Sequence, residues 1–316
     1  MTNFIIRRLV SMIPTLLGAS LLVFLIMRVV PGDVAVTMLG EQAASDPVSL
    51  AKLRHELGTD RPLYVQYVTW VAGIVRGDLG TSLWNRSPVA PEIMRRVPIT
   101  AQLAIMAVIF GFCFGLPLGI TSALKRGTWV DAVARVVSVM FLAAPSFWIG
   151  LLVIMFLSRT FNWIPPLGYH LLWVEPGENL AQLIFPALVI AVQLMAIISR
   201  MTRSTMLEVL REDYIRTARA KGLSESVVIV RHVMKNSMIP VITIVSLSMG
   251  SLLAGAVVME RTFTIPGMGL YLLQSITVRD YTAVQAMVLM MSFIFVAINF
   301  MTDLTYGWLD PRISRH

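Results

Sequence analysis

The chain has 316 residues, of which 56% are hydrophobic and only 14% are charged. Globular domains carry about 25% charged residues, so this composition excludes an ordinary soluble domain and indicates an integral membrane protein. The formal net charge is +8, and the single cysteine, Cys113, excludes an internal disulfide.

Six apolar segments are long enough to cross a bilayer, because a spanning helix needs about 20 mainly apolar residues. They cover residues 9–30, 99–122, 132–157, 180–199, 239–259 and 284–304. We therefore predict an all-α, polytopic membrane protein with six transmembrane helices. The first segment is longer than the roughly 7–15 apolar residues of a signal peptide, and we interpret it as a helix that stays attached.

The segment between the first two spans predicts a structured outer loop, residues 31–98. Asp46 and Pro47 form a helix start signal, and Gly58 is a helix stop. A second short helix is expected from Pro62 to about Arg76, with tyrosine and tryptophan side chains suited to a membrane interface. The chain thus divides into residues 1–98, the first span with this loop, and residues 99–316, a five-helix core with a cytoplasmic loop at 200–238.

Polar residues within the spans usually face the interior of a bundle or a water-filled route. We predict that a translocation path is lined by Gln102, Ser146, Gln193, Ser246 and Asn299. Close helix packing is the alternative interpretation of Ser246. Outside the spans, residues 158–180 predict a rigid interfacial turn, and the glycines and proline of residues 260–283 predict a short re-entrant or loop segment.

The distribution of charge predicts the orientation of the chain. With the N-terminus inside, the inner segments hold fifteen basic and six acidic residues, whereas the outer segments hold eleven of each. Asp303, in the last span, completes the net charge of +8. Because basic residues concentrate on the cytoplasmic side, we predict an N-in, C-in topology and no nucleic-acid partner.

The segment from Arg200 to Pro240 combines basic character with helical spacing. Apolar residues recur from Met206 to Ala218, Gly222 ends this helix, and Ser224 is placed to cap another. The pattern predicts a helix–glycine–helix elbow whose apolar face needs a surface. An anionic lipid surface is one alternative, but the interspersed acidic residues favour a protein partner.

At this point the chain resembles a known family. The elbow sequences DYIRTARAKGLS and RHVMKNSMIP resemble the EAA loop of the membrane subunits of binding-protein-dependent ABC importers. The nearest branch comprises the first-subunit permeases for peptides, nickel and opines, dipeptide permeases among them. The likeness extends through FIIRRLVSMIPTLLGASLLVFLIMRVVPGD, DRPLYVQYVTW, GDLGTSL, ERTFTIPGMGLYL, VRDYTAVQ and LDPRI. The chain departs from the general motif at its Glu-Ala-Ala positions, which hold Arg216, Thr217 and Ala218.

The resemblance implies a type I importer permease in the bacterial cytoplasmic membrane. It implies these partners: a homologous second permease subunit, two cytoplasmic ATPase subunits that bind ATP and Mg, a substrate-binding protein outside, and membrane lipid. It also implies that the elbow couples the chain to the ATPases through Arg216, Thr217, Ala218, Arg219, Ala220, Lys221, Gly222 and Leu223.

The expected function is transport without catalysis by this chain. The sequence has no GxxxxGK[ST] phosphate loop and no metal-binding spacing of histidines or cysteines, so we expect no cofactor or metal here. Peptides are the predicted cargo, with nickel chelates, glutathione or opines as alternatives. A secondary transporter would favour inverted repeats and charged midplane residues, and a membrane enzyme would need clustered acid–base side chains.

Overall fold

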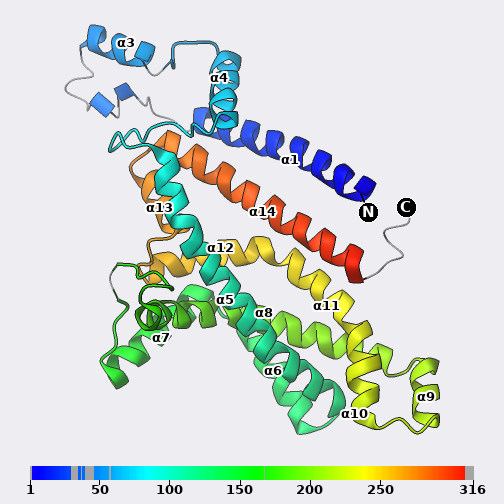
Figure 1. Ribbon diagram of the computed structural model, residues 1–316. Helices are drawn as coiled ribbons and strands as arrows, with labels where there is room; N and C mark the ends of the chain where they lie inside the picture. Colours follow the sequence, from blue (N-terminus) through cyan, green and yellow to red (C-terminus); the bar gives the residue numbers. More distant parts are fainter. Residues whose placement is uncertain are drawn as a thin grey trace. The chain divides into compact units, whose positions relative to one another are not determined.

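The computed structural model describes residues 2–29, 35–36, 38–39, 46–56, 58–166 and 168–309. These residues are almost entirely helical, as the sequence predicts, and an isolated bridge between Thr81 and Pro88 is their one strand-like pairing (Figure 1). Helices satisfy their own backbone hydrogen bonds, which a bilayer cannot do for them. The chain forms two compact units: the described residues up to Pro98 with Leu270–Leu304, and Ile99–Gly269.

Five helices of the described residues are long and apolar enough to span a membrane, and the number is six if a bent pair of shorter helices counts as one span. Four of the predicted spans correspond to the single helices α1 (Thr2–Val29), α5 (Val89–Leu124), α8 (Pro176–Val209) and α14 (Tyr281–Leu309). The prediction of an all-α, polytopic membrane protein is confirmed, and the six predicted spans compare with five long helices and one bent pair among the described residues.

The third predicted span is not one straight helix. It consists of α6 (Trp129–Ala143) and α7 (Ser146–Phe161), which meet at an angle of 102°. Pro145 lacks a backbone N–H and disfavours helical geometry in the residue before it. Ala144 accordingly has an extended conformation, with ψ of 129°. The bend therefore follows from a proline that the sequence places inside the segment.

The fifth predicted span is shifted and broken. A continuous helical run of α10 (Glu225–Val227), the π-helix η1 (Val228–Met234) and α11 (Lys235–Leu247) supplies the span, and α12 (Met249–Thr262) follows after a break. At the break, the Ser248 hydroxyl donates to the Ile244 carbonyl over 2.7 Å. Such back-bonding often bends helices, so residues 239–259 do not form the single helix that their hydropathy predicts.

In the first unit, the outer-loop helices form where the sequence places them. Helix α3 (Pro47–Glu56) begins after Asp46, whose carboxylate accepts the N–H groups of Val48 and Ser49, and Gly58 has φ of +65°. Helix α4 (Leu63–Val75) packs on α1 through aromatic rings, with the centroid of Phe24 5.4 Å from that of Tyr67. These contacts fasten a helix too short to span the membrane to one that spans it.

The segment expected to be a loop or re-entrant near residues 260–283 contains a helix, α13 (Met268–Thr277). The turn that precedes it is held by the fully buried Glu260, which accepts a 2.6 Å hydrogen bond from the Thr100 hydroxyl. That hydroxyl accepts in turn from the backbone N–H of Met268 over 2.9 Å. Gly267 is needed in this turn because a Cβ atom there would clash with the Glu260 carboxylate, and the residues from Met268 onward continue as helix.

Helix α8 is the centre of the second unit. In its most apolar stretch 56% of residues are buried, against 17% in α1. The core around it is formed by buried apolar side chains, including Leu103, Leu183, Leu194, Ile198, Val241 and Met259.

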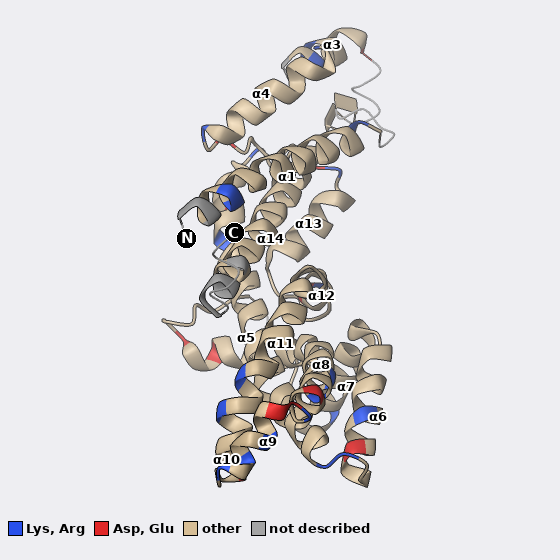
Figure 2. Ribbon diagram, turned by 90° about the vertical axis from the view of Figure 1, so that its right-hand side faces the viewer, with Lys and Arg blue, Asp and Glu red and all other residues tan. Residues whose placement is uncertain are grey.

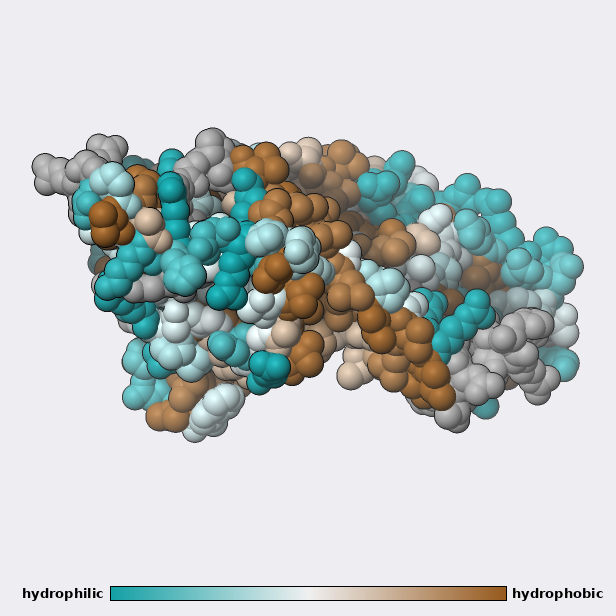
Figure 3. All heavy atoms as spheres, turned by 90° about the horizontal axis from the view of Figure 1, so that it is seen from above, coloured by the Kyte–Doolittle hydropathy of each residue, from teal (hydrophilic) through white to brown (hydrophobic). Residues whose placement is uncertain are grey.

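The surface of the protein has charged and apolar regions. Charged residues of the second unit gather around α6, α9 and α10 (Figure 2). Many exposed side chains on the face in Figure 3 are apolar. The exposed apolar groups suit helices surrounded by lipid.

Helices α5 and α8 approach each other along a row of glycines. Gly111, Gly115 and Gly119 recur every four residues, and a Cβ atom at any of them would lie within 3 Å of an atom of α8. At Gly119 the nearest atoms include the Ser199 backbone oxygen, 2.7 Å away. Small residues at this spacing let spanning helices pack closely. The row therefore fixes how α5 lies on α8.

We predict that Gly119→Ala destabilises the protein. The new methyl group must displace backbone rather than a movable side chain, and overpacking of this kind costs about 1–3 kcal/mol. Gly18→Ala in α1 is the matched control, because nothing lies within 4 Å of its Cβ position. Thermal unfolding of the purified protein in detergent should show a lower midpoint for Gly119→Ala and no decrease for Gly18→Ala. Equal midpoints would contradict close α5–α8 packing.

Candidate functional site

The elbow of residues 210–227 begins where α8 ends. The sequence predicts one helix through Met206 and Ala218, but the structure breaks it: α8 stops at Val209, and α9 (Asp213–Ala220) starts after a turn. Glu212 at the turn is extended, with ψ of 144°. The turn redirects α9 so that its apolar side faces the rest of the chain, which a continuation of α8 would not allow.

The apolar side of α9 is buried within this chain. Ile215 is fully buried and Ala218 is 7% exposed, and both belong to a group of packed residues that we call the elbow cluster. The elbow cluster consists of Ala123, Met206, Ile215, Ala218, Val228 and Val233. The expectation that this face needs an external surface is therefore wrong, because α8 and η1 provide one.

The remaining side of the elbow is exposed and mainly polar. Except for Ile215 and Ala218, every residue from 211 to 227 is exposed. Of the eight residues predicted to couple to an ATPase, the structure therefore exposes seven and buries Ala218. Figure 2 shows charged residues of both signs along this part of the chain. We call these exposed residues the elbow surface.

Gly222 makes the reversal after α9, as the sequence predicts. Its φ is +80°, a left-handed value that other residues adopt only with strain. The Leu223 N–H donates to the Ala218 carbonyl and the Gly222 N–H to the Arg219 carbonyl, the pattern of a Schellman motif. Ser224 occupies the predicted cap position of the next helix, but its side chain makes no capping hydrogen bond.

A salt bridge closes the elbow across Gly222. The Arg219 guanidinium donates to both carboxylate oxygens of Glu225, over 2.6 and 3.1 Å. This hydrogen bond raises the pKa of Arg219 above its usual value. Both side chains are about half exposed, and pairs of this kind contribute at most about 1 kcal/mol of stability. The pair therefore adds little to the free energy of folding, and its main effect is to fix the orientation of α9 relative to α10.

The neighbouring turn between α5 and α6 is tied to α8 by a buried carboxylate. Asp131 is 1% exposed and accepts from the Arg203 guanidinium over 2.7 and 2.9 Å. It also accepts from the Ser122 hydroxyl over 2.6 Å. Arg203 lies only two turns of α8 before the elbow, so the end of α8 is held at α6 as well as in the elbow cluster. From the sequence, Asp131 is only one of the six acidic residues of the inner segments.

The predicted path residues lie in several places. Gln193 on α8 donates to the Ala144 carbonyl over 3.4 Å, at the α6–α7 bend, and Ser146 is the first residue of α7. The Gln102 side-chain amide donates a 2.5 Å hydrogen bond to the side-chain oxygen of Asn179. The Ser246 hydroxyl donates to the Ile242 carbonyl within its own helix. The structure thus brings Gln193 and Ser146 to one bend.

Asn299 belongs to the first unit. It lines a small pocket of about 150 Å³ with residues of α1 and α14.

A groove that the sequence does not reveal lies on α6, α8 and α11 of the second unit. It has a volume of about 1040 Å³ and is lined by apolar residues together with three arginines and two serines, Arg135, Arg200, Arg203, Ser204 and Ser248. Ile197 and Met201, which line it, lie one and two turns beyond Gln193 on the same side of α8. The relevant residues come from helices far apart in the sequence, so hydropathy alone could not assemble them.

Comparison with known proteins gives two family matches. Residues 115–315 match the family described as "Binding-protein-dependent transport system inner membrane component". Residues 1–104 match the corresponding N-terminal family, "Binding-prot-dependent transport system membrane comp, N-term". Together they account for nearly the whole chain.

Individual proteins show the same likeness. The chain is 42% identical to the di/tripeptide transport system permease protein DppB of Pseudomonas aeruginosa (strain UCBPP-PA14) and 41% identical to the dipeptide transport system permease protein DppB of Escherichia coli (strain K12). Each alignment covers 100% of this chain and 99% of the relative. The glutathione transport system permease protein GsiC of Salmonella choleraesuis (strain SC-B67) is 38% identical, with 99% of both chains covered.

A solved structure supports the fold. It is described as "Inward facing conformations of the MetNI methionine ABC transporter: CY5 native crystal form", and the TM-score is 0.53. The match covers 69% of this chain and 96% of that chain at 17% identity, so it bears on the fold alone.

We predict that Ile215→Ala loosens α9 from the elbow cluster. Loss of a buried isoleucine side chain costs about 2–5 kcal/mol, which corresponds to a fall in local protection of about 30-fold or more. Amide hydrogen exchange should accelerate in α9 while α5 and α8 exchange as before. Thr217→Ala, on the exposed side of the same helix, serves as the control and should change α9 little. Equal exchange in both variants would show that the elbow cluster does not hold α9.

Proposed function

This chain belongs to the family of binding-protein-dependent transport system inner membrane components, and we propose that it forms half of a path for peptides. It is the permease subunit of an ABC importer and a multi-pass protein of the inner membrane. The observation that carries the proposal is the full-length identity of 41–42% to permeases named for dipeptides and di/tripeptides. A match limited to the shared core would not support a statement on cargo.

Glutathione is the second candidate cargo. A full-length relative named for glutathione transport is 38% identical, slightly less than the relatives named for dipeptides. Both candidates are small peptide-like solutes, so they make similar demands on a path. The proposal therefore ranks dipeptides first and keeps glutathione as an outcome of the test, while nickel chelates and opines gain no further support.

We infer that the elbow surface is the docking site for an ATPase subunit. Its exposed side offers polar and charged groups to a partner, and its buried side is fixed to α8 and η1 through the elbow cluster. A displacement of α9 therefore reaches two spanning segments directly. Coupling between ATP hydrolysis and transport requires a physical connection of this kind between two states of the bundle.

The proposed assembly contains this chain, a homologous permease subunit and two ATPase subunits. The ATPase subunits would bind ATP and Mg, so this chain would need no cofactor and would not be an enzyme. A substrate-binding protein would deliver cargo from outside, opposite the elbow, in agreement with an N-in, C-in orientation. The charges gathered around α6, α9 and α10 support the placement of this end of the second unit in the cytoplasm (Figure 2).

The path is proposed to pass the α6–α7 bend. Gln193 and Ser146 lie there, and the groove on α6, α8 and α11 continues from Gln193 along α8. Ser246, on α11, has its hydroxyl committed to its own helix, so it would line the path through its small size. Gln102, bonded to Asn179, would set the outer end of the path by holding α5 to α8.

The proposal is tested by replacing Gly222 in a strain that lacks the chromosomal copy of this gene. Wild type should restore uptake of a labelled dipeptide, whereas Gly222→Val should not, because a left-handed conformation costs other residues about 1–2 kcal/mol and the elbow would refold. Gly127→Val is the matched control. Gly127 also has positive φ, +79°, and like Gly222 has nothing within 4 Å of its Cβ position, but it lies outside the elbow.

The outcomes of this experiment distinguish the assignment of the cargo from the assignment of the elbow as the coupling element. Uptake that survives Gly222→Val, with normal amounts of protein in the membrane, would contradict the elbow as the coupling element. If wild type restores uptake of labelled glutathione and not of the dipeptide, the cargo assignment fails and the coupling assignment stands. Loss of uptake in both valine variants would show that backbone strain anywhere, rather than the elbow, is responsible.

A further inference from the structure

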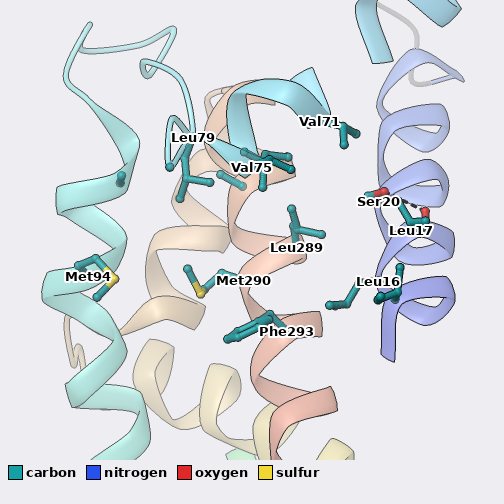
Figure 4. Close-up of a pocket in the computed structure, with 15 residues that line it drawn as sticks. Leu16, Leu17, Ser20, Val71, Val75, Leu79, Met94, Leu289, Met290 and Phe293 are labelled. Atoms are coloured by element: carbon teal, nitrogen blue, oxygen red, sulfur yellow. Dashed lines mark hydrogen bonds between the residues drawn. The ribbon is translucent and has the colours of Figure 1, made fainter. Parts of the chain in front are cut away.

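The first unit contains an apolar pocket lined by none of the residues assigned to the proposed path. Its volume is about 570 Å³, within the range of about 300–1,000 Å³ typical of small-molecule sites. Residues from α1, α4, the start of α5 and α14 line it, as Figure 4 shows for Leu17, Val75, Met94 and Phe293. Helix α4 lies across one end of the pocket in this view, with Val71 and Val75 beside the cavity.

The lining offers nothing to a polar occupant. Ser20 is its only residue with a polar side chain, and the Ser20 hydroxyl already bonds the Leu17 carbonyl and the Tyr67 hydroxyl, each over 2.8 Å. A buried water needs two to four polar partners, so this cavity is unsuited to water. Its occupant must be apolar wherever it lies against the helices.

The position of the pocket indicates which apolar molecule is available. The lining residues of α1 and α14 lie within the spans Ile5–Val29 and Tyr281–Thr302, so the pocket is at membrane depth. Several of them, including Ile13, Met94 and Phe293, are at least half exposed, so the pocket is open on one side. Open apolar space at this depth faces the acyl chains of the bilayer.

The pocket is too small to enclose a helix from a partner subunit. A helix 10–12 Å across occupies roughly 800 Å³ for each 10 Å of its length, so only side chains of such a helix would enter a pocket of about 570 Å³. The rim suits a phospholipid headgroup instead. Arg76 is exposed and lies in the sequence between the lining residues Val75 and Gly77, and a guanidinium matches a phosphate in charge and geometry.

We propose that this pocket binds one acyl chain of a phospholipid from the outer leaflet, with its phosphate at Arg76. The chain would fill the space between α1, α4 and α14 and so complete the packing of the first unit. Because lipid tails are as apolar as leucine, the affinity would come from the fit of the chain and from the phosphate contact. The site is independent of which solute is transported.

The test uses the assembled importer in nanodiscs that contain phosphatidylglycerol with a photoactivatable diazirine on one acyl chain. Irradiation should label residues 13–20, 71–79 and 286–293 more than other membrane-facing segments. Ala90→Phe, which places a ring in the cavity, should lower this labelling about ten-fold, a loss of about 1.4 kcal/mol of binding free energy. Ala101→Phe, at an exposed position of the same helix, is the control and should leave the labelling unchanged.

Three outcomes would overturn the proposal. They are uniform labelling of all membrane-facing segments, unchanged labelling in Ala90→Phe, and cross-linking of a photoactivatable residue at Met94 to a partner subunit. If Ala90→Phe fails to assemble, Val71→Phe fills the same cavity from α4 and gives the same test.

Discussion

The burial of Ile215 and Ala218 in the elbow cluster is the contact on which the coupling account depends. It converts a short polar helix, which on its own would be too short to be stable in water, into a fixed part of the membrane subunit. The left-handed Gly222 and the Arg219–Glu225 pair then set the angle between its two arms. Because Met206 and Val228 share the elbow cluster, force applied to α9 would act on α8 and on η1 together.

The spanning helices are rigid in some places and broken in others. Close packing at Gly111, Gly115 and Gly119 holds α5 to α8, and Asp131 fastens the α5–α6 turn to Arg203. In contrast, Pro145 bends the third span, and Ser248 separates α11 from α12. The π-helical η1 lies between the elbow and α11, and such segments are frequent at functional sites. A bundle with these breaks has places where helices can move without losing the α5–α8 core.

Much of the fold follows from the sequence because hydropathy, charge and glycine act locally. The spans, the two outer helices and the reversal at Gly222 were predicted on these grounds. The bend at Pro145 is also local in origin, because a proline inside a span can kink it. The break at Ser248 and the turn before α9 were not predicted, because each depends on what the helix meets in three dimensions. For the same reason the sequence suggested an external surface for α9, since it could not show that Val228 and Val233 return to cover Ile215. The glycine row on α5 is a further local signal, because three glycines spaced by four residues indicate close helix packing.

The most direct test of the central claim asks what the elbow surface contacts in the assembled importer. A photoactivatable benzoylphenylalanine at Thr217, on the exposed side of α9, should cross-link to an ATPase subunit. The same residue at Ser87, in the outer loop, should give no such product. Cross-linking from Thr217 to lipid alone, or an ATPase product from Ser87, would contradict the account that the elbow transmits ATP hydrolysis to this subunit.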